Sequence, residues 1–249
     1  MKPELNLFGL LVPTYFLTLS IVFSFIIFAL VKRAKSVNVD PNKALDLYLY
    51  ILCGSFLGAR IFFILYQDLS YFIENPTEVF SVWNGGFVFY GGFIGGTLSI
   101  VLFTKLRKES LTLWLNFCAP LLALGYGLGR MACLLNGCCF GAATDVWWGV
   151  HLHGALRHPT QLYAVFWELL LFALLIIYEK LRGFNSKPDV FSIWLIGHGF
   201  GRLIMEYFRA DNRGALLFDQ SVSTLISFVL IGSGFVILAL VSLKKNGSA

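Results

Sequence analysis

The chain has 249 residues and a formal net charge of +5, and 57% of its residues are hydrophobic whereas only 13% are charged. Its mean hydropathy is +0.75. Soluble globular domains carry about 25% charged residues, so this composition excludes an ordinary soluble protein and indicates an integral membrane protein. Apolar segments follow one another from end to end, which predicts a single membrane domain over residues 1–249.

Apolar segments of about 20 residues predict membrane-spanning helices, and the chain contains about seven of them. In chain order they cover residues 8–31, 44–66, 87–103, 111–135, 161–178, 190–208 and 221–243. The first segment is not followed by a small-residue cleavage site, so we expect it to remain as a span. The predicted fold class is an all-α, polytopic membrane helix bundle.

Lysine and arginine mark alternate loops, after the first, third, fifth and seventh segments. These basic residues are Lys32, Arg33, Lys35, Lys43, Lys105, Arg107, Lys108, Lys180, Arg182, Lys187, Lys244 and Lys245. The loop 67–86 contains none. The positive-inside rule therefore predicts an N-terminus outside and a cytoplasmic C-terminus. Short basic runs in this setting are topology signals and lipid contacts, so we expect membrane lipids and no nucleic acid as partners.

Arg60, Arg130, Arg202 and Glu206 lie inside the predicted spans and are not explained as residues that reach from a helix end to the membrane surface. An unpaired charge at this depth costs at least about 2.5–3.5 kcal/mol, so each must face a partner or a wet cavity. Arg202 and Glu206 are four residues apart and share a helix face, which makes a buried ion pair one interpretation. The excess of guanidinium groups favours another, a phosphate site for a phospholipid head group.

Six glycines stand within residues 85–96. Small residues permit close helix packing in membranes, and glycine also lets a ligand approach the backbone. Close packing is the favoured interpretation, and the two are compatible.

Cys133, Cys138 and Cys139 crowd into one segment on the predicted outer side. Either a Cys133–Cys138 or Cys133–Cys139 disulfide, or three free thiols beside a lipid site, would fit. His151 and His153 follow, but the spacing matches no strong zinc pattern, so we expect no metal and no cofactor.

Six motifs occur along the chain in a fixed order. They are PTYF, LGARIF, GGFVFYGGFIGG, GYGLGRMACLLNGCCFG, RHPTQLY and GRLIMEYFR. Together they resemble the motifs of bacterial prolipoprotein diacylglyceryl transferases over residues 13–213, and RHPTQLY is the most specific. The resemblance implies a seven-span enzyme of the bacterial cytoplasmic (inner) membrane. It implies transfer of the diacylglyceryl group of phosphatidylglycerol to the lipobox cysteine of a preprolipoprotein, with formation of a thioether and release of glycerol phosphate.

Positions within these motifs imply the site residues. Arg130 and Arg202 match essential arginines of the family and are expected to stabilise the leaving phosphate. Tyr90 and His158 are the candidates for accepting or orienting the thiol proton. The expected substrate-binding residues are Arg130, Arg209, Arg60, Tyr15, Asn136, Gly91, Gly92, Gly141, Gln161, Tyr163 and Glu206.

The chain departs from the family pattern at three positions. Tyr90, Cys133 and Cys138 stand where the family usually has His, Asn and Glu. Tyrosine, with a pKa near 10, is a weak base at neutral pH. His158 precedes Pro159, which favours an extended turn and leaves a structural role open.

Other functions remain open at this point. A membrane thiol oxidoreductase would use the three cysteines, although the chain has no C-x-x-C motif. A transporter would also contain buried arginines and glycine-rich helices, but the two halves show no internal repeat. A family member that binds lipid or lipoprotein without catalysis would explain the substituted motif residues.

Overall fold

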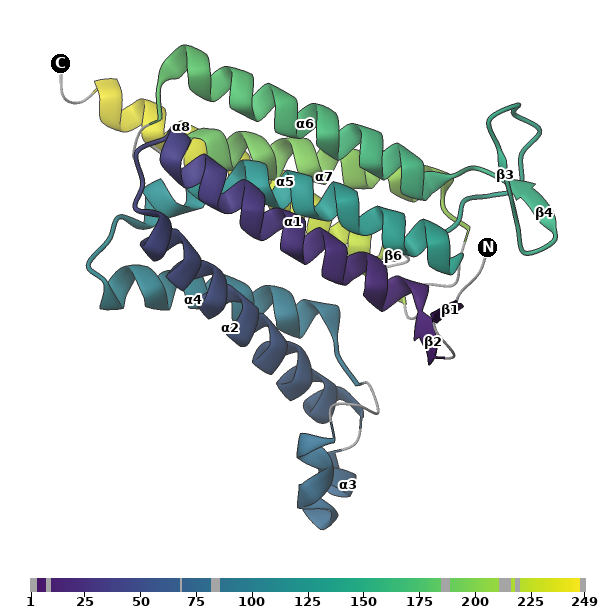
Figure 1. Ribbon diagram of the computed structural model, residues 1–249. Coiled ribbons are helices and arrows are strands. Elements are labelled where there is room, and N and C mark those ends of the chain that lie inside the picture. The colour runs from purple at the N-terminus through teal and green to yellow at the C-terminus, as the bar shows by residue number, and fades with distance from the viewer. Residues whose placement is uncertain are drawn as a thin grey trace. The chain divides into compact units, whose positions relative to one another are not determined.

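The computed structural model describes residues 4–7, 10–67, 69–81, 86–184, 189–210, 216–217 and 220–246, and these are mainly helical (Figure 1). The helices are α1 Thr14–Ser36, α2 Pro41–Gln67, α3 Leu69–Glu74, the 3-10 turn η1 Pro76–Phe80, α4 Phe89–Leu106, α5 Leu111–Asn136, α6 Thr160–Arg182, α7 Asp189–Phe208 and α8 Val222–Asn246. The strands are β1 Glu4–Leu7, β2 Leu10–Pro13, β3 Val150–Leu152, β4 Ala155–Arg157, β5 Leu216–Leu217 and β6 Gln220–Ser221. They pair in sequence as three antiparallel hairpins.

Five helical segments among the described residues are long and apolar enough to cross a membrane. They are Thr14–Ser36, Pro41–Leu65, Leu111–Asn136, Thr160–Arg182 and Val222–Leu243. Gly91–Leu106 is a shorter apolar helix. Large apolar side chains such as Phe16, Phe28 and Val229 are exposed on them, as expected of a surface covered by lipid. The prediction of an all-helical, multi-span membrane protein is thereby confirmed.

Each predicted apolar segment coincides with a long helix, but the predicted start of the first one is wrong. Residues Leu10–Pro13 pair with Glu4–Leu7 in a hairpin, and α1 begins at Thr14. The ring of Pro13 disfavours a helical conformation at the residue before it, so the apolar character of this stretch serves a strand.

The chain forms two compact units, which are described separately. The smaller unit contains residues 30–114, and the larger unit contains residues 1–29 and 115–249. In the smaller unit, α2 and α4 pack together at glycines on both helices. A Cβ atom on Gly91 would meet the Gly58 carbonyl and lie 2.5 Å from the Cβ of Phe62, and one on Gly95 would lie 3.1 Å from the Cα of Gly58. The close-packing interpretation of the glycine-rich motif is therefore confirmed.

In the larger unit, α5, α6 and α7 run side by side (Figure 1). A buried apolar cluster joins them; it consists of Ala119, Ala123, Leu171, Leu175, Val190, Trp194 and Leu195. The fully buried side chain of Asn116 accepts a hydrogen bond from the backbone N–H of Phe191 at 3.0 Å, which satisfies a donor in the first turn of α7. Gly197 and Gly201 allow α6 to approach, and Gly199 allows α8 to approach. These contacts fix α7, which carries Arg202 and Glu206.

The α2–α4 packing predicts that Gly95→Ala lowers the free energy of unfolding by about 1–3 kcal/mol, because the added methyl group overpacks the interface. The measurement is the apparent melting temperature in detergent. Gly232→Ala on α8 is the control, because no described atom lies within 4 Å of its added carbon. The control should keep its melting temperature or rise slightly, since alanine favours helices. Equal melting temperatures for the two variants would contradict close packing of α2 on α4.

Candidate active site

Arg130 lies one turn before the end of α5 and takes a neutral partner. Its Nη2 donates a hydrogen bond to the hydroxyl oxygen of Tyr126, four residues earlier on the same helix face. Its guanidinium carbon also lies 4.6 Å from the centre of the Tyr126 ring. A hydroxyl group and an aromatic face stabilise the cation without neutralising it. The charge of Arg130 therefore remains available to an anion.

Arg202 and Glu206 are close enough to form an ion pair on α7. Arg202 Nη2 lies 3.8 Å from Glu206 Oε2 and donates to Ser223 Oγ at 2.7 Å. The Ser221 hydroxyl donates to Glu206 Oε1. The predicted pairing is present, but 3.8 Å is longer than a direct charge-assisted hydrogen bond.

The structure brings the predicted arginines of the larger unit into one electrostatic environment. Arg202 interacts with the charges of both Arg130 and Arg209. Tyr15, in the first turn of α1, interacts with Arg130 and with the three neighbouring cysteines. Like charges repel strongly where the dielectric is low, so this group favours a bound anion.

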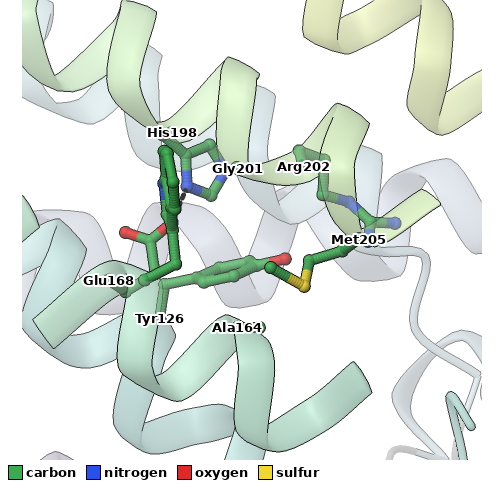
Figure 2. A pocket seen from close by; sticks show the side chains of 8 residues that line it. Tyr126, Ala164, Glu168, His198, Gly201, Arg202 and Met205 are labelled. Atoms are coloured by element: carbon green, nitrogen blue, oxygen red, sulfur yellow. Dashed lines mark hydrogen bonds and ion pairs between the residues drawn. The ribbon is translucent and has the colours of Figure 1, made fainter. Parts of the chain in front are cut away.

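A small cavity lies between α5, α6 and α7 beside this group, as Figure 2 shows. Its lining residues are Tyr126, Ala164, Trp167, Glu168, His198, Gly201, Arg202 and Met205. His198 Nδ1 lies 2.6 Å from Glu168 Oε1, which is the dashed line in Figure 2. Glu168 is only 2% exposed, and its Oε2 has no hydrogen-bond partner among the described residues.

Glu168 and Tyr126 were absent from the sequence-based set of site residues. Glu168 could have been identified, because a carboxylate inside an apolar span requires a partner or a function. Tyr126 is recognisable only through its spacing from Arg130. His198 is a hydrogen-bonding residue inside α7.

The segment after α5 turns sharply and brings three thiols together. Gly137 has φ +74°, its N–H donates to Leu134 O at 3.1 Å, and the N–H of Cys138 donates to Cys133 O at 3.1 Å. This pair of bonds is the Schellman ending of a helix, which favours glycine at the left-handed position. The Sγ atoms of Cys133, Cys138 and Cys139 all lie within 4.8 Å of one another. All three cysteines are free and half-buried.

Cys139 lies beyond the end of α5 and is set apart from an ordinary thiol. Hydrogen bonds from the thiols of Cys133 and Cys138 hold its pKa well below the usual range. The guanidinium charges of Arg130 and Arg209 lower this pKa further.

The first turn of α6 holds this segment in place. Thr160 Oγ1 donates to the Cys139 carbonyl and Gln161 Nε2 donates to the Cys138 carbonyl, both at 2.6 Å. Both side chains are almost fully buried. The amide nitrogen of Gln161 therefore anchors this segment, and a substrate-binding role for Gln161 stays a prediction.

Gly141 lies at a crossing of three chain segments. Its N–H donates to His158 O at 3.0 Å, and the next residue, Ala142, donates to Phe208 O at 2.8 Å. A Cβ atom on Gly141 would lie 2.6 Å from the Cβ of His158 and 2.9 Å from Phe208 O. Only glycine fits here, and the bridge between Gly141 and Arg209 depends on this fit.

His158 belongs to a short chain of hydrogen bonds. Trp148 Nε1 donates to Tyr163 Oη at 2.7 Å, and the same hydroxyl group is hydrogen-bonded to His158 Nδ1 at 3.0 Å. These bonds hold the His158 ring in one orientation.

Comparison with known proteins identifies the family. The family model described as prolipoprotein diacylglyceryl transferase matches residues 4–240. The phosphatidylglycerol–prolipoprotein diacylglyceryl transferases of Streptococcus pneumoniae strains JJA and Hungary19A-6 are each 30% identical over 227 residues, covering 88% of this chain and 86% of theirs. The chain belongs to the prolipoprotein diacylglyceryl transferase family. The resemblance seen in the motifs is confirmed.

The family motifs divide between the two units. Tyr15, Arg130, Asn136, Gly141, His158, Gln161, Tyr163, Arg202, Glu206 and Arg209 belong to the larger unit, and Arg60, Tyr90, Gly91 and Gly92 belong to the smaller one. Asn136 is the last residue of α5 and is exposed. Tyr90 lies in the first turn of α4, but its side chain lies outside the described part of the chain.

Arg60 is engaged with the backbone of its own unit. Its guanidinium group donates to the carbonyls of Glu78 at 2.7 Å, Val79 at 3.1 Å and Gly86 at 3.2 Å. It also lies 5.5 Å from the centre of the Phe63 ring. These bonds account for a buried arginine structurally, and its substrate-binding role stays a prediction.

His151 and His153 do not share a strand face. His151 lies in β3, which ends at Leu152, and His153 lies in the following turn with φ +51°. The β3–β4 turn therefore begins between them.

The buried Glu168–His198 pair generates a stability prediction. His198→Phe keeps an aromatic ring stacked on Trp194 but leaves the Glu168 carboxyl without its partner. We expect a loss of about 1–3 kcal/mol of unfolding free energy, measured as a lower melting temperature in detergent. The double variant His198→Phe with Glu168→Leu should recover most of the loss, because both polar groups are then gone. A double variant less stable than the single one would contradict the pairing.

Proposed function

We propose that this protein transfers the diacylglyceryl group of phosphatidylglycerol to the lipobox cysteine of a preprolipoprotein, forming a thioether and releasing glycerol phosphate. The observation that carries the proposal is that Arg202 lies within electrostatic range of both Arg130 and Arg209 in the larger unit. The names of the Streptococcus pneumoniae relatives state the same donor and acceptor. The enzyme activity predicted from the sequence motifs agrees with the grouping of the arginines and with the names of these relatives.

Charge bookkeeping in the larger unit supports a phosphate ligand. Among the described residues, Arg130 bonds to the neutral hydroxyl group of Tyr126, whereas Arg202 lies 3.8 Å from the Glu206 carboxylate. The Tyr126 hydroxyl leaves the positive charge of Arg130 in place. A phosphodiester supplies one negative charge in the substrate, and the phosphomonoester that leaves carries more. The arginines therefore bind the leaving group more strongly as the reaction proceeds, which is the condition for catalysis.

The chemistry is a displacement at carbon. The cysteine sulfur attacks the glycerol carbon that bears the phosphate, a C–S bond forms, and the C–O bond to phosphate breaks with its electron pair on oxygen. Arg130 and Arg202 stabilise that oxygen, and Arg209 lies where the chain returns past Gly141. The attacking species is the thiolate, so the thiol proton must leave.

The site residues take distinct roles in this scheme. Tyr163 and Trp148 position the His158 ring through their hydrogen bonds, and His158 is a candidate for accepting or orienting the thiol proton. Tyr90 is the other candidate, and Tyr15, Asn136 and the anchoring residues shape the lipid site.

The units act as one membrane domain in this proposal. Residues 1–249 form a single seven-span domain of the bacterial cytoplasmic membrane, with the N-terminus outside and the C-terminus in the cytoplasm. The alternation of basic loops supports this orientation. The cysteine segment and the β3–β4 hairpin then face the outer side, where preprolipoproteins present their lipobox.

The function is tested by incubating purified protein with phosphatidylglycerol and a lipobox peptide and measuring the peptide mass. The wild type should add a diacylglyceryl group and release glycerol phosphate. Arg130→Gln should lower the initial rate by about 10²–10³-fold, the effect of removing one donor to a developing oxyanion. Arg182→Gln, at the exposed end of α6, should keep the wild-type rate. An unchanged rate in Arg130→Gln would remove Arg130 from the mechanism.

Orientation is tested with fusions expressed in bacteria. Alkaline phosphatase fused after Gly154 should be active, because this position is expected outside the membrane. The same enzyme fused after Lys108 should be inactive, because this position is expected in the cytoplasm. A fluorescent protein at the C-terminus should fluoresce. The opposite pattern at any of the three positions would overturn the proposed topology.

A further inference from the structure

The three thiols at the end of α5 have the geometry of a zinc site. Thiolate ligands bind Zn²⁺ at about 2.3 Å, which in a tetrahedron separates their sulfurs by about 3.8 Å. Cys133, Cys138 and Cys139 already have all their Sγ atoms within 4.8 Å of one another. Small side-chain rotations bring them to the required spacing, so the backbone is in place for a metal.

That backbone is held from two sides. Thr160 and Gln161 donate hydrogen bonds to the carbonyls of Cys139 and Cys138, each at 2.6 Å. His153 Nε2 lies 2.7 Å from the carbonyl oxygen of Gly137. These bonds fix the backbone from which the Cys138 and Cys139 thiols project. Cys139 itself has φ +62°, a left-handed conformation that residues other than glycine seldom adopt.

The number of ligands indicates the kind of site. Structural zinc sites have four protein ligands, whereas catalytic ones have three and an open position. Among the described residues, the group within ligand range consists of these three cysteines. Three ligands from the described part of the chain leave the fourth position for a substrate atom, as in a catalytic site.

We propose that Cys133, Cys138 and Cys139 bind Zn²⁺ and that its open position takes the lipobox cysteine as a thiolate. This inference rests on the proposed transferase function. On binding, the S–H bond of the lipobox cysteine breaks, its proton passes to water, and a Zn–S bond forms. The zinc-bound sulfur then attacks the glycerol carbon, the C–O bond breaks toward phosphate, and the thioether leaves the metal.

The position of the site suits this reaction. Cys133 follows Arg130 by one helical turn, so the metal lies beside the arginine that binds the leaving phosphate. A zinc ion with three thiolates carries excess negative charge, which a nearby guanidinium group stabilises. A coordinated thiol is deprotonated outright, so the metal supplies the nucleophile without a strong protein base.

Metal content is the first test. The protein purified without chelator should contain about one zinc per chain, and a variant with all three cysteines changed to serine should contain less than about 0.1. Cys53→Ser, on an exposed position of α2, is the matched control and should keep its zinc and its activity. Zinc-free wild type, or a disulfide between any two of the three cysteines in active protein, would overturn the proposal.

The open position is tested spectroscopically in the wild type, which avoids any variant that fails to fold. Co²⁺ replaces zinc after chelation, and its thiolate charge-transfer absorbance reports the number of sulfur ligands. Adding a lipobox peptide should raise this absorbance by about one third, from three thiolates to four. The same peptide with its cysteine replaced by serine should not. No rise with the cysteine peptide would overturn the assigned role.

Rates separate this proposal from the transferase function itself. Chelated protein should transfer the lipid at least about tenfold more slowly, and added zinc should restore the rate. Full activity in zinc-free protein would overturn the zinc proposal and leave the transferase intact. If no preparation forms the product, the transferase function is overturned. The role of zinc in the reaction then falls with it, even if the cobalt spectrum shows that the three cysteines bind metal.

Discussion

An arginine inside a bilayer is stable only where a partner, an anion or water meets its charge, and this requirement shapes the larger unit. Arg130 on α5 and Arg202 on α7 are placed by helices whose packing leaves little freedom. Asn116 joins α5 to α7, and Gly197 and Gly201 admit α6 closely. Among the described residues, the neutral hydroxyl groups of Tyr126 and Ser223 accept hydrogen bonds from Arg130 and Arg202, and the Glu206 carboxylate lies 3.8 Å from Arg202. The protein therefore maintains a positive charge at low dielectric, where a phosphate group is bound most strongly.

The same helices position the nucleophile side of the site. The glycine ending of α5 turns the chain so that Cys138 and Cys139 return beside Cys133, and the first turn of α6 fixes that turn through Thr160 and Gln161. Gly141 then lets the strand-like segment pass between His158 and Phe208. Phosphate binding and thiol chemistry thus share one rigid frame, since Arg130 and Cys133 stand on the same last turns of α5. A shared frame is what aligns an attacking atom with a leaving group.

Much of this was accessible from the sequence, because charge in apolar segments is rare enough to be informative. Arg130, Arg202 and Glu206 were identified in this way, and the helices followed from apolar length alone. The start of α1 was misplaced because Leu10–Pro13 is as apolar as the helix that follows, although it pairs as a strand. The anchoring of Arg60 depends on backbone carbonyls, which have no sequence pattern. Likewise the convergence of the three thiols depends on the left-handed turn at Gly137, and a spacing rule for zinc motifs does not contain that geometry.

The central claim is that the arginines hold the phosphate of the lipid donor. It is tested most directly by measuring lipid retention by the purified protein with native mass spectrometry. Phosphatidylglycerol is compared with a diacylglycerol of the same acyl chains, which lacks the phosphate. The account predicts that the wild type retains phosphatidylglycerol and that added glycerol phosphate displaces it. The Arg202→Gln variant should lose phosphatidylglycerol, and diacylglycerol should bind weakly to both proteins. Equal retention of the two lipids, unaffected by glycerol phosphate, would contradict it.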